Sequence, residues 1–255
     1  MKIAVAGGTG VAGRATVAAL RAAGHEAVVL ARSTGADLVS GAGLAEGLTG
    51  MDAVIDTTNI TTMSARAAIG FFEATARHLT RAAGQAGVGH IVVLSIIGID
   101  RVPYSYYRGK LRQEEVLGDS PVPVSILRTA QFHEFPGQYL ARSTGRFVVV
   151  PKMRTQPVAV REAGAALARI AAGPPVPRSE LAGPREEVLA DMVRQVVRAR
   201  GERRRVIEVR VPGAAGRAMA AGGGLPEGTL PYGTELRGTQ TFADWLREQQ
   251  ASGTL

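Results

Sequence analysis

Short apolar runs alternate with stretches of helical periodicity through the first half of the chain. The runs that predict buried strands are 3–6, 27–30, 53–59, 90–95 and 122–129, and the third ends in polar residues. Helical patterns lie between them at 14–23, 44–48, 65–84 and 104–117. Runs that are apolar on both faces are typical of parallel strands covered by helices. The order predicts an α/β fold of Rossmann type, a doubly wound parallel sheet with helices on both faces.

The rest of the chain carries weaker signals. A brief strand is expected around 37–39, and later elements are helices at 158–172, 188–199 and 242–249 and a strand at 206–211. Pro-rich and Gly-rich segments at 174–177 and 222–226 mark loops, the second of which is either a flap over a substrate or an ordinary connection. With no long linker, 1–255 is expected to be one domain. Its cofactor-binding core would be 1–131, and 132–255 would complete the fold and add a small substrate-binding portion.

Composition narrows the class of protein. The chain has 255 residues, no cysteine and a net charge of +8. It shows neither a signal-peptide pattern nor an apolar stretch long enough to span a membrane, so we expect a cytoplasmic protein without a membrane partner. The arginine-rich segment 198–205 has no interleaved aromatic residues, which favours a solvated helix end over nucleic-acid binding. The four histidines have no metal-ligand spacing. Alanine-rich helices are compatible with a homodimer, although nothing in the sequence requires one.

The first apolar run leads into a glycine-rich turn and a helix. Gly7, Gly10 and Gly13 follow the run at a spacing of three. In a dinucleotide site the first glycine makes a tight turn, the second admits the pyrophosphate, and the third allows the helix to pack closely. The helix amides would then face the phosphates. This arrangement predicts a bound dinucleotide.

The residue after the second strand indicates which dinucleotide binds. NAD sites usually carry an acidic residue about twenty positions beyond the glycines, where it accepts from the ribose 2′-hydroxyl. Here that position holds Arg32, followed by Ser33. Because a guanidinium pairs with a 2′-phosphate, the sequence favours NADP over NAD.

Ser95, Tyr106 and Lys110 form a candidate catalytic set. Tyr106 and Lys110 are four residues apart on a predicted helix and therefore share a face, while Ser95 ends the preceding strand. A nearby ammonium would lower the pKa of the phenol, so that Tyr106 could exchange a proton with a carbonyl or alcohol oxygen. Ser95 would hold that oxygen. The alternative is a core tyrosine beside a solvent-facing lysine, since Tyr104 and Tyr107 lie on the same helix.

These motifs resemble the short-chain dehydrogenase/reductase superfamily, specifically its atypical NmrA-like NAD(P)-binding branch. The resemblance covers residues 1 to about 140 and rests on segments 7–13, 94–98, 106–110 and 126–135. It implies a catalytic Ser–Tyr–Lys set at Ser95, Tyr106 and Lys110. The cofactor-lining residues that it and the glycine pattern nominate are Gly7, Gly8, Thr9, Gly10, Val11, Ala12, Gly13, Arg32, Ser33, Asp37, Thr57, Thr58, Asn59, Lys110, Thr129 and Phe132. Phe132 and His133 would lie near the nicotinamide or the substrate, although an isolated histidine is more often a structural hydrogen-bonding residue.

Two departures leave alternatives open. Many members of the superfamily carry an asparagine in the helix before the serine strand, and segment 64–84 has none. NmrA-like relatives also include redox sensors that bind the dinucleotide without turnover, and many of these lack the tyrosine. We therefore expect an NADP-dependent oxidoreductase acting on a small carbonyl or alcohol. The alternatives are a non-catalytic NADP sensor and an isomerase or epimerase that retains its cofactor.

Overall fold

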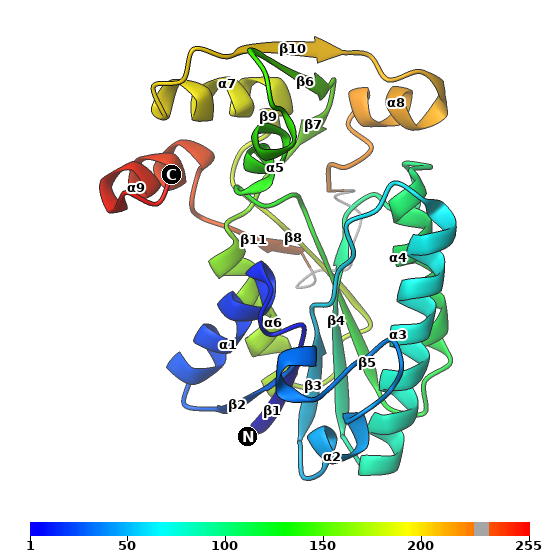
Figure 1. Ribbon diagram of the computed structural model, residues 1–255. Helices are drawn as coiled ribbons and strands as arrows, with labels where there is room; N and C mark the ends of the chain where they lie inside the picture. The colour runs from blue at the N-terminus through cyan, green and yellow to red at the C-terminus, as the bar shows by residue number, and fades with distance from the viewer. Residues whose placement is uncertain (227–234) are drawn as a thin grey trace. The chain divides into compact units, whose positions relative to one another are not determined.

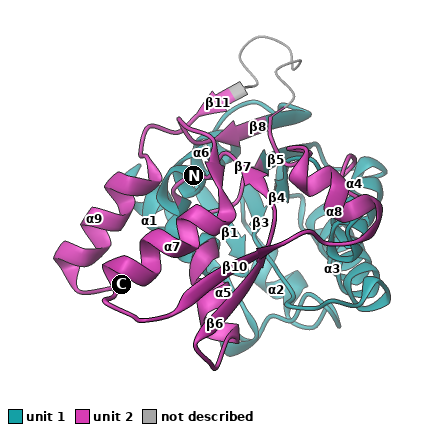
Figure 2. Cartoon of the chain, turned by 90° about the horizontal axis from the view of Figure 1, so that it is seen from above, with its two compact units in different colours: residues 1–99, 104–128, 160–179 teal, residues 100–103, 129–159, 180–255 magenta. Residues whose placement is uncertain are grey.

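A computed structural model describes residues 1–226 and 235–255. The chain forms two compact units, coloured separately in Figure 2. Unit 1 comprises residues 1–99, 104–128 and 160–179, and unit 2 comprises residues 100–103, 129–159 and 180–255. The division of the chain into a core at 1–131 and a second portion at 132–255 stays a prediction.

Unit 1 is built on a parallel sheet. Its strands are β1 (Lys2–Ala6), β2 (Glu26–Leu30), β3 (Ala53–Asp56), β4 (His90–Ile96) and β5 (Val124–Thr129). β1 lies at the centre, paired in parallel with β2 and β3. The sheet has the order β11-β8-β5-β4-β3-β1-β2, where β8 (Arg178–Ala182) starts in unit 1 and pairs in unit 2 with β11 (Glu235–Arg237). This sheet confirms the Rossmann-type fold expected from the sequence.

Two pairs of helices cover the sheet of unit 1. α1 (Val11–Ala22) packs on α6 (Val160–Ala172), and α3 (Ala65–Ala86) packs on α4 (Ser105–Gly118). Figure 1 shows the two pairs on opposite faces of the strands. The short α2 (Leu44–Leu48) joins the α3 side, where its leucines enter a core with Leu79 and Ile91. The apolar runs of β1, β3 and β4 are therefore buried on both faces, as expected for central parallel strands, whereas β2 lies at the edge of the sheet and is mostly half-buried.

The α3–α4 contact is unusually close because α4 lacks a side chain at Gly109. A Cβ atom at that position would lie 2.7 Å from the backbone carbonyl carbon of Ala68 on α3 and 2.8 Å from the ring of Phe72. Real Cβ atoms essentially never approach other atoms this closely. The glycine thus allows the two helix backbones to meet beside Lys110.

Unit 2 is a mixed assembly of short elements. These are α5 (Phe135–Arg142), β6 (Phe147–Pro151), β7 (Arg154–Thr155), β9 (Glu187–Val188), α7 (Leu189–Ala199), β10 (Arg205–Val209), α8 (Gly213–Ala220) and α9 (Phe242–Ser252). β6 pairs in parallel with β10, and β7 pairs with β9 in the antiparallel sense. Its core combines Val148 and Val150 of β6 with Val193 of α7 and Phe242 of α9. The N-cap of α9 is Thr241, whose side chain accepts from the amide of Asp244 in a capping box.

One expected strand is absent. Residues 37–39 form a turn, because the Asp37 carboxylate accepts a hydrogen bond from the amide of Val39 at 2.9 Å. A side chain that bonds its own backbone two residues on competes with strand pairing. The expected strand at 37–39 was therefore wrong. The helices expected at 44–48, 65–84, 104–117 and 242–249 are confirmed to within a few residues. In the described part of the chain, no helix is long and apolar enough to cross a membrane.

Candidate dinucleotide and catalytic site

The glycine-rich turn joins β1 to α1. Gly7 has φ +73°, a conformation that other residues rarely adopt, and its amide donates to the carbonyl of Leu30 at 2.9 Å. A Cβ atom at Gly13 would lie 2.2 Å from the carbonyl oxygen of Gly7. The helix can therefore begin directly against the turn, and both glycines are sterically required.

The N-terminus of α1 suits an anionic ligand. Its N-cap is Gly10, which supplies no side chain to the first amides, and its first turn carries no acidic residue. The first turn of a helix leaves backbone amides without intrahelical partners, and the helix dipole favours negative charge there. Arg14 lies over the turn and donates to the carbonyl of Thr9 at 2.5 Å. These residues fit the pyrophosphate of a dinucleotide.

The segment after β3 connects this turn to α4. The backbone of Thr57 lies against Gly7, at 3.1 Å from the position of a Cβ there, and the Thr57 hydroxyl donates to the carbonyl of Ala6 at 2.8 Å. Two residues further on, Asn59 accepts a hydrogen bond from the Tyr106 hydroxyl at 2.6 Å. The three residues 57–59 thus run from the glycine turn to the phenol, a span of about 10 Å when extended.

The residues after β2 lie at the carboxyl end of that strand, next to the glycine turn. Arg32 and Ser33 lie in a single 3₁₀ turn, Arg32–Thr34, and are exposed. Among the described residues, the Arg32 guanidinium makes no ion pair or hydrogen bond. Asp37 is half-buried in the following turn. Since the amide of Gly7 bonds the last residue of β2, Arg32 lies two residues from a contact of the glycine turn.

Tyr106 and Lys110 lie on one face of α4, packed on Phe72 of α3. The Phe72 ring meets the Tyr106 ring edge-on at 5.6 Å, and the Lys110 Nζ lies 4.4 Å from the centre of the Phe72 ring. No hydrogen bond joins Tyr106 to Lys110 within the described residues. Burial, with a smaller contribution from Tyr107, raises the pKa of the Tyr106 phenol. The expectation that a nearby ammonium lowers this pKa was wrong, because desolvation is the largest cause of the shift and raises the pKa.

The Lys110 ammonium is buried in a polar network that the sequence did not reveal. It donates to the carbonyl of Leu94 at 2.8 Å and to Gln113 Oε1 at 2.9 Å. Gln113 Nε2 in turn donates at 2.8 Å to Asp56, which is completely buried at the end of β3. Burial lowers the pKa of Lys110 to about 8, whereas the carboxylates of Asp56 and Glu114 oppose this shift. Asp56 therefore supports the charge of an otherwise desolvated lysine.

Ser95 belongs to a second buried network. Its side chain is 1% exposed, and its hydroxyl donates to Glu114 Oε1 at 2.5 Å. The same carboxylate receives two hydrogen bonds from Arg128, at 3.1 Å from Nε and 2.7 Å from Nη2. Because a hydroxyl has one proton, Ser95 offers lone pairs, and no donor, to other groups while it is bonded to Glu114. Glu114 follows Tyr106 and Lys110 at the same spacing of four, and that periodicity is the signal that could have found it.

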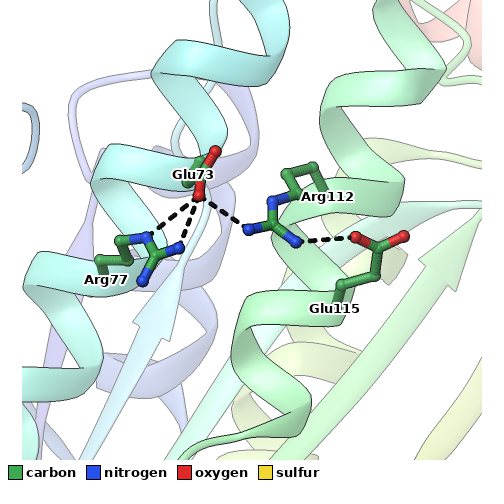
Figure 3. A network of polar contacts seen from close by, with 4 residues as sticks. All are labelled: Glu73, Arg77, Arg112 and Glu115. Atoms are coloured by element: carbon green, nitrogen blue, oxygen red, sulfur yellow. Dashed lines mark hydrogen bonds and ion pairs between the residues drawn. The ribbon is translucent and has the colours of Figure 1, made fainter.

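The opposite side of α4 carries an exposed ion-pair network instead. Figure 3 shows Arg112 between Glu73 of α3 and Glu115 of α4, with Arg77 also bonded to Glu73. Hydrogen bonds from Arg112 and Arg77 lower the pKa of Glu73 to about 2. The helix thus has one buried polar face, which includes the candidate catalytic residues, and one solvated face.

Three nominated residues belong to unit 2. Thr129 ends β5 and is buried, and Phe132 forms a parallel bridge with Val158. His133 is completely buried, and its Nε2 donates to the carbonyl of Gln240 at 3.2 Å. The His133 ring packs on the rings of Phe242 and Trp245, with centroids 5.7 and 5.9 Å away. Their roles toward cofactor or substrate stay predictions. In the residues that the structure describes, no cluster of three potential ligands could hold a metal ion.

The β1–glycine turn–α1 unit on a parallel sheet defines a dinucleotide-binding protein of Rossmann type. A family model described as NAD(P)H-binding matches residues 7–159, which is more than half of the chain. The chain therefore belongs to the NAD(P)H-binding family. No protein with a curated description matches the sequence.

Solved structures share the fold at low sequence identity. The NADPH-dependent quinone oxidoreductase QOR2 of Escherichia coli, complexed with NADPH, matches with a TM-score of 0.72 and 19% identity, over 96% of this chain and 99% of its own. The triphenylmethane reductase of a Citrobacter species matches with a TM-score of 0.67 and 16% identity, over 88% of this chain and 91% of its own. DesIV of Streptomyces venezuelae, a dTDP-glucose 4,6-dehydratase, matches with a TM-score of 0.75 and 18% identity, over 99% of this chain and 98% of its own. These likenesses establish the fold.

Proposed function

We propose that the protein is an NADP-dependent oxidoreductase that transfers hydride between the nicotinamide and a small carbonyl or alcohol. The observation that carries this proposal is the short path from the glycine turn through residues 57–59 to the Tyr106 hydroxyl. A dinucleotide held at the turn would extend along this path toward the Tyr106 phenol. When bound, the dinucleotide supplies the hydride.

Tyr106 is the proton donor to the substrate oxygen. Its raised pKa keeps the phenol protonated at neutral pH, which favours reduction of a carbonyl over oxidation of an alcohol. To donate to a substrate, the phenol exchanges its hydrogen bond to Asn59 for one to the carbonyl oxygen. The Lys110 ammonium, held by Gln113 and the Leu94 carbonyl, stabilises the phenolate that follows proton transfer. Ser95 orients the same oxygen once its hydroxyl rotates away from Glu114.

Arg32 selects NADP. Its exposed guanidinium, free of partners in the described residues, is suited to a 2′-phosphate. We expect Arg32→Gln to weaken NADPH binding by at least about tenfold, since a hydrogen bond to a charged group contributes about 1.5–3 kcal/mol. Binding of NADH should be unchanged. Arg21→Gln removes an exposed arginine from α1 and is the control for net charge. Equal losses for NADPH and NADH in titration calorimetry would contradict the assignment.

Two neighbours support a reductase: one is named as an NADPH-dependent quinone oxidoreductase and the other as a triphenylmethane reductase. The deciding experiment follows NADPH oxidation with a panel of small quinones and aldehydes. Tyr106→Phe keeps the ring contact with Phe72 and removes the hydroxyl, so turnover should fall by at least about a hundredfold while NADPH affinity is retained. Tyr104→Phe, at the N-cap of α4, removes a hydroxyl that donates to the Met63 sulfur and should leave turnover unchanged. Wild-type turnover by Tyr106→Phe would overturn the catalytic role.

The Ser95–Glu114 hydrogen bond favours a second candidate, an NADP sensor without turnover. A serine that donates to a buried carboxylate is not available as a donor to substrate unless it rotates. A sensor would bind NADP and NADPH with different affinities and oxidise NADPH with no member of the panel. A cofactor-retaining epimerase, the activity named for one structural neighbour, would instead convert its sugar nucleotide without net consumption of NADPH.

A further inference from the structure

Two strands of unit 2 form a small separate sheet. β6 and β10 pair only with each other among the described strands, with Val149 opposite Ile207. One face of this sheet is covered: Val148 and Val150 are buried in the core with α7, which Figure 1 shows along the two strands. A two-stranded sheet has no second layer of its own on the other side.

That other face is apolar and exposed. Alternate residues of a strand point to the same side, so Phe147, Val149, Ile207 and Val209 share it, and Val211 continues it beyond β10. Their exposed fractions are 55, 53, 42, 37 and 40%. These five residues are the β6–β10 face. Large apolar side chains are normally exposed singly, and a contiguous group of them marks a contact surface.

Cations border the face at both ends. Arg146 and Arg205 stand where the strands begin, and Lys152 and Arg210 follow where they end. At the latter end is an open hollow of about 330 Å³, lined by Lys152, Arg210 and Arg217. Gly216 and Ala220 of α8 also line the hollow, and their small side chains leave space between the three cations. Within the described residues, none of these three cations makes an ion pair or a side-chain hydrogen bond.

We propose that the β6–β10 face rests on an anionic lipid bilayer. Its apolar side chains would enter the interfacial region, while the arginines contact lipid phosphates and the hollow accepts one headgroup. A second copy of the chain would bring the same cations against these, in a protein of net charge +8. The face also has no tyrosine or tryptophan, the residues on which protein interfaces most depend. The sequence predicts no membrane partner because no segment spans a bilayer. The proposed contact departs from that prediction, since a surface that rests on a bilayer requires no spanning segment.

Cosedimentation with vesicles tests the proposal on the full chain. Vesicles of phosphatidylcholine alone are compared with vesicles that also contain phosphatidylglycerol. We expect binding to the anionic vesicles, weakened by salt. Arg210→Gln with Arg217→Gln should lower the affinity about thirtyfold, since each arginine near such a surface contributes about a fivefold change. Arg21→Gln with Arg81→Gln, which removes the same charge from exposed sites in unit 1, is the matched control.

The apolar part has its own variants. Val149→Thr with Ile207→Thr keeps the β-branched shape and should reduce vesicle binding at least tenfold, whereas Val39→Thr, at an exposed valine of unit 1, should not. The proposal fails if the wild type does not bind anionic vesicles, or if replacing the control pair of arginines lowers the vesicle affinity as much as replacing the pair in the hollow. It fails also if inorganic phosphate binds at the hollow while vesicles do not. A dimer in light scattering that the threonine variant dissociates would assign the face to a second copy instead.

Discussion

The buried pair of Glu114 and Arg128 offers the sharpest test of how unit 1 is held together. The side chains are 12 and 4% exposed, and three hydrogen bonds converge on the carboxylate, two from Arg128 and one from Ser95. Glu114→Gln removes the charge with little change in volume. It takes the carboxylate charge away from the buried Arg128 guanidinium, and removing one partner of a buried ion pair typically costs about 3–5 kcal/mol. For a chain of this size the thermal midpoint should fall by about 10 °C.

The neighbouring residue on α4 is the control. Glu115 pairs with Arg112 on the solvated side of the helix (Figure 3), and Glu115→Gln should leave the thermal midpoint unchanged. Both variants are followed by far-UV circular dichroism during heating and by urea titration. Replacing both members of the buried pair, Glu114→Leu with Arg128→Met, should recover much of the loss because the guanidinium is removed together with the carboxylate. Equal midpoints for Glu114→Gln and Glu115→Gln would refute the argument.

Two further predictions concern the glycine turn and the β4 histidine. Gly13→Ala places a methyl group 2.2 Å from the Gly7 carbonyl oxygen and should abolish NADPH binding in calorimetry, whereas Gly70→Ala, where a Cβ meets open space on α3, should bind normally and unfold no earlier than the wild type. Burial lowers the pKa of His90 below its usual 6.5, against a smaller effect of the Ala171 backbone. The unfolded chain therefore takes up this proton first as the pH falls, so stability is lost from about pH 6.5 down to the folded-state pKa, by up to about 1.4 kcal/mol per pH unit. Urea titrations of His90→Asn and wild type should show a flatter pH dependence for the variant in that window, and parallel curves would contradict the assignment.

The sequence predicted the parts of the fold in which local pattern and tertiary role agree. The apolar run before Gly7 can only be a buried strand next to a helix, and the four-residue spacing of Tyr106 and Lys110 puts them on one helix face in any packing. The turn at Asp37 was misjudged because its side-chain hydrogen bond is invisible to hydrophobic pattern. β6 was overlooked although 147–150 is apolar, since only its pairing with β10, far along the chain, makes it a strand.

The partners of the candidate catalytic residues were beyond sequence reasoning for a different reason. Asp56 and Gln113 are 57 residues apart, and their hydrogen bond exists because β3 and α4 pack together. Composition showed several carboxylates but not which of them would lie near Lys110. The pKa of Lys110 is lowered by its own burial and raised by Asp56 and Glu114, and both effects depend on the packing. The four-residue spacing identified the face of α4 that carries Tyr106 and Lys110, whereas the pKa values of these residues depend on neighbours that only the structure shows.

The missing side chain at Gly109 has a consequence for how the site can change. It allows α4 to lie against the backbone of Ala68, and Tyr106 stands one turn before it on the same helix. Any methyl group there would wedge the helices apart and draw the phenol away from the strand end that bears Asn59. The position of the Tyr106 hydroxyl therefore depends on the absence of a side chain at residue 109. A larger residue there would need a backbone shift in α3, because the nearest atoms belong to the backbone of Ala68.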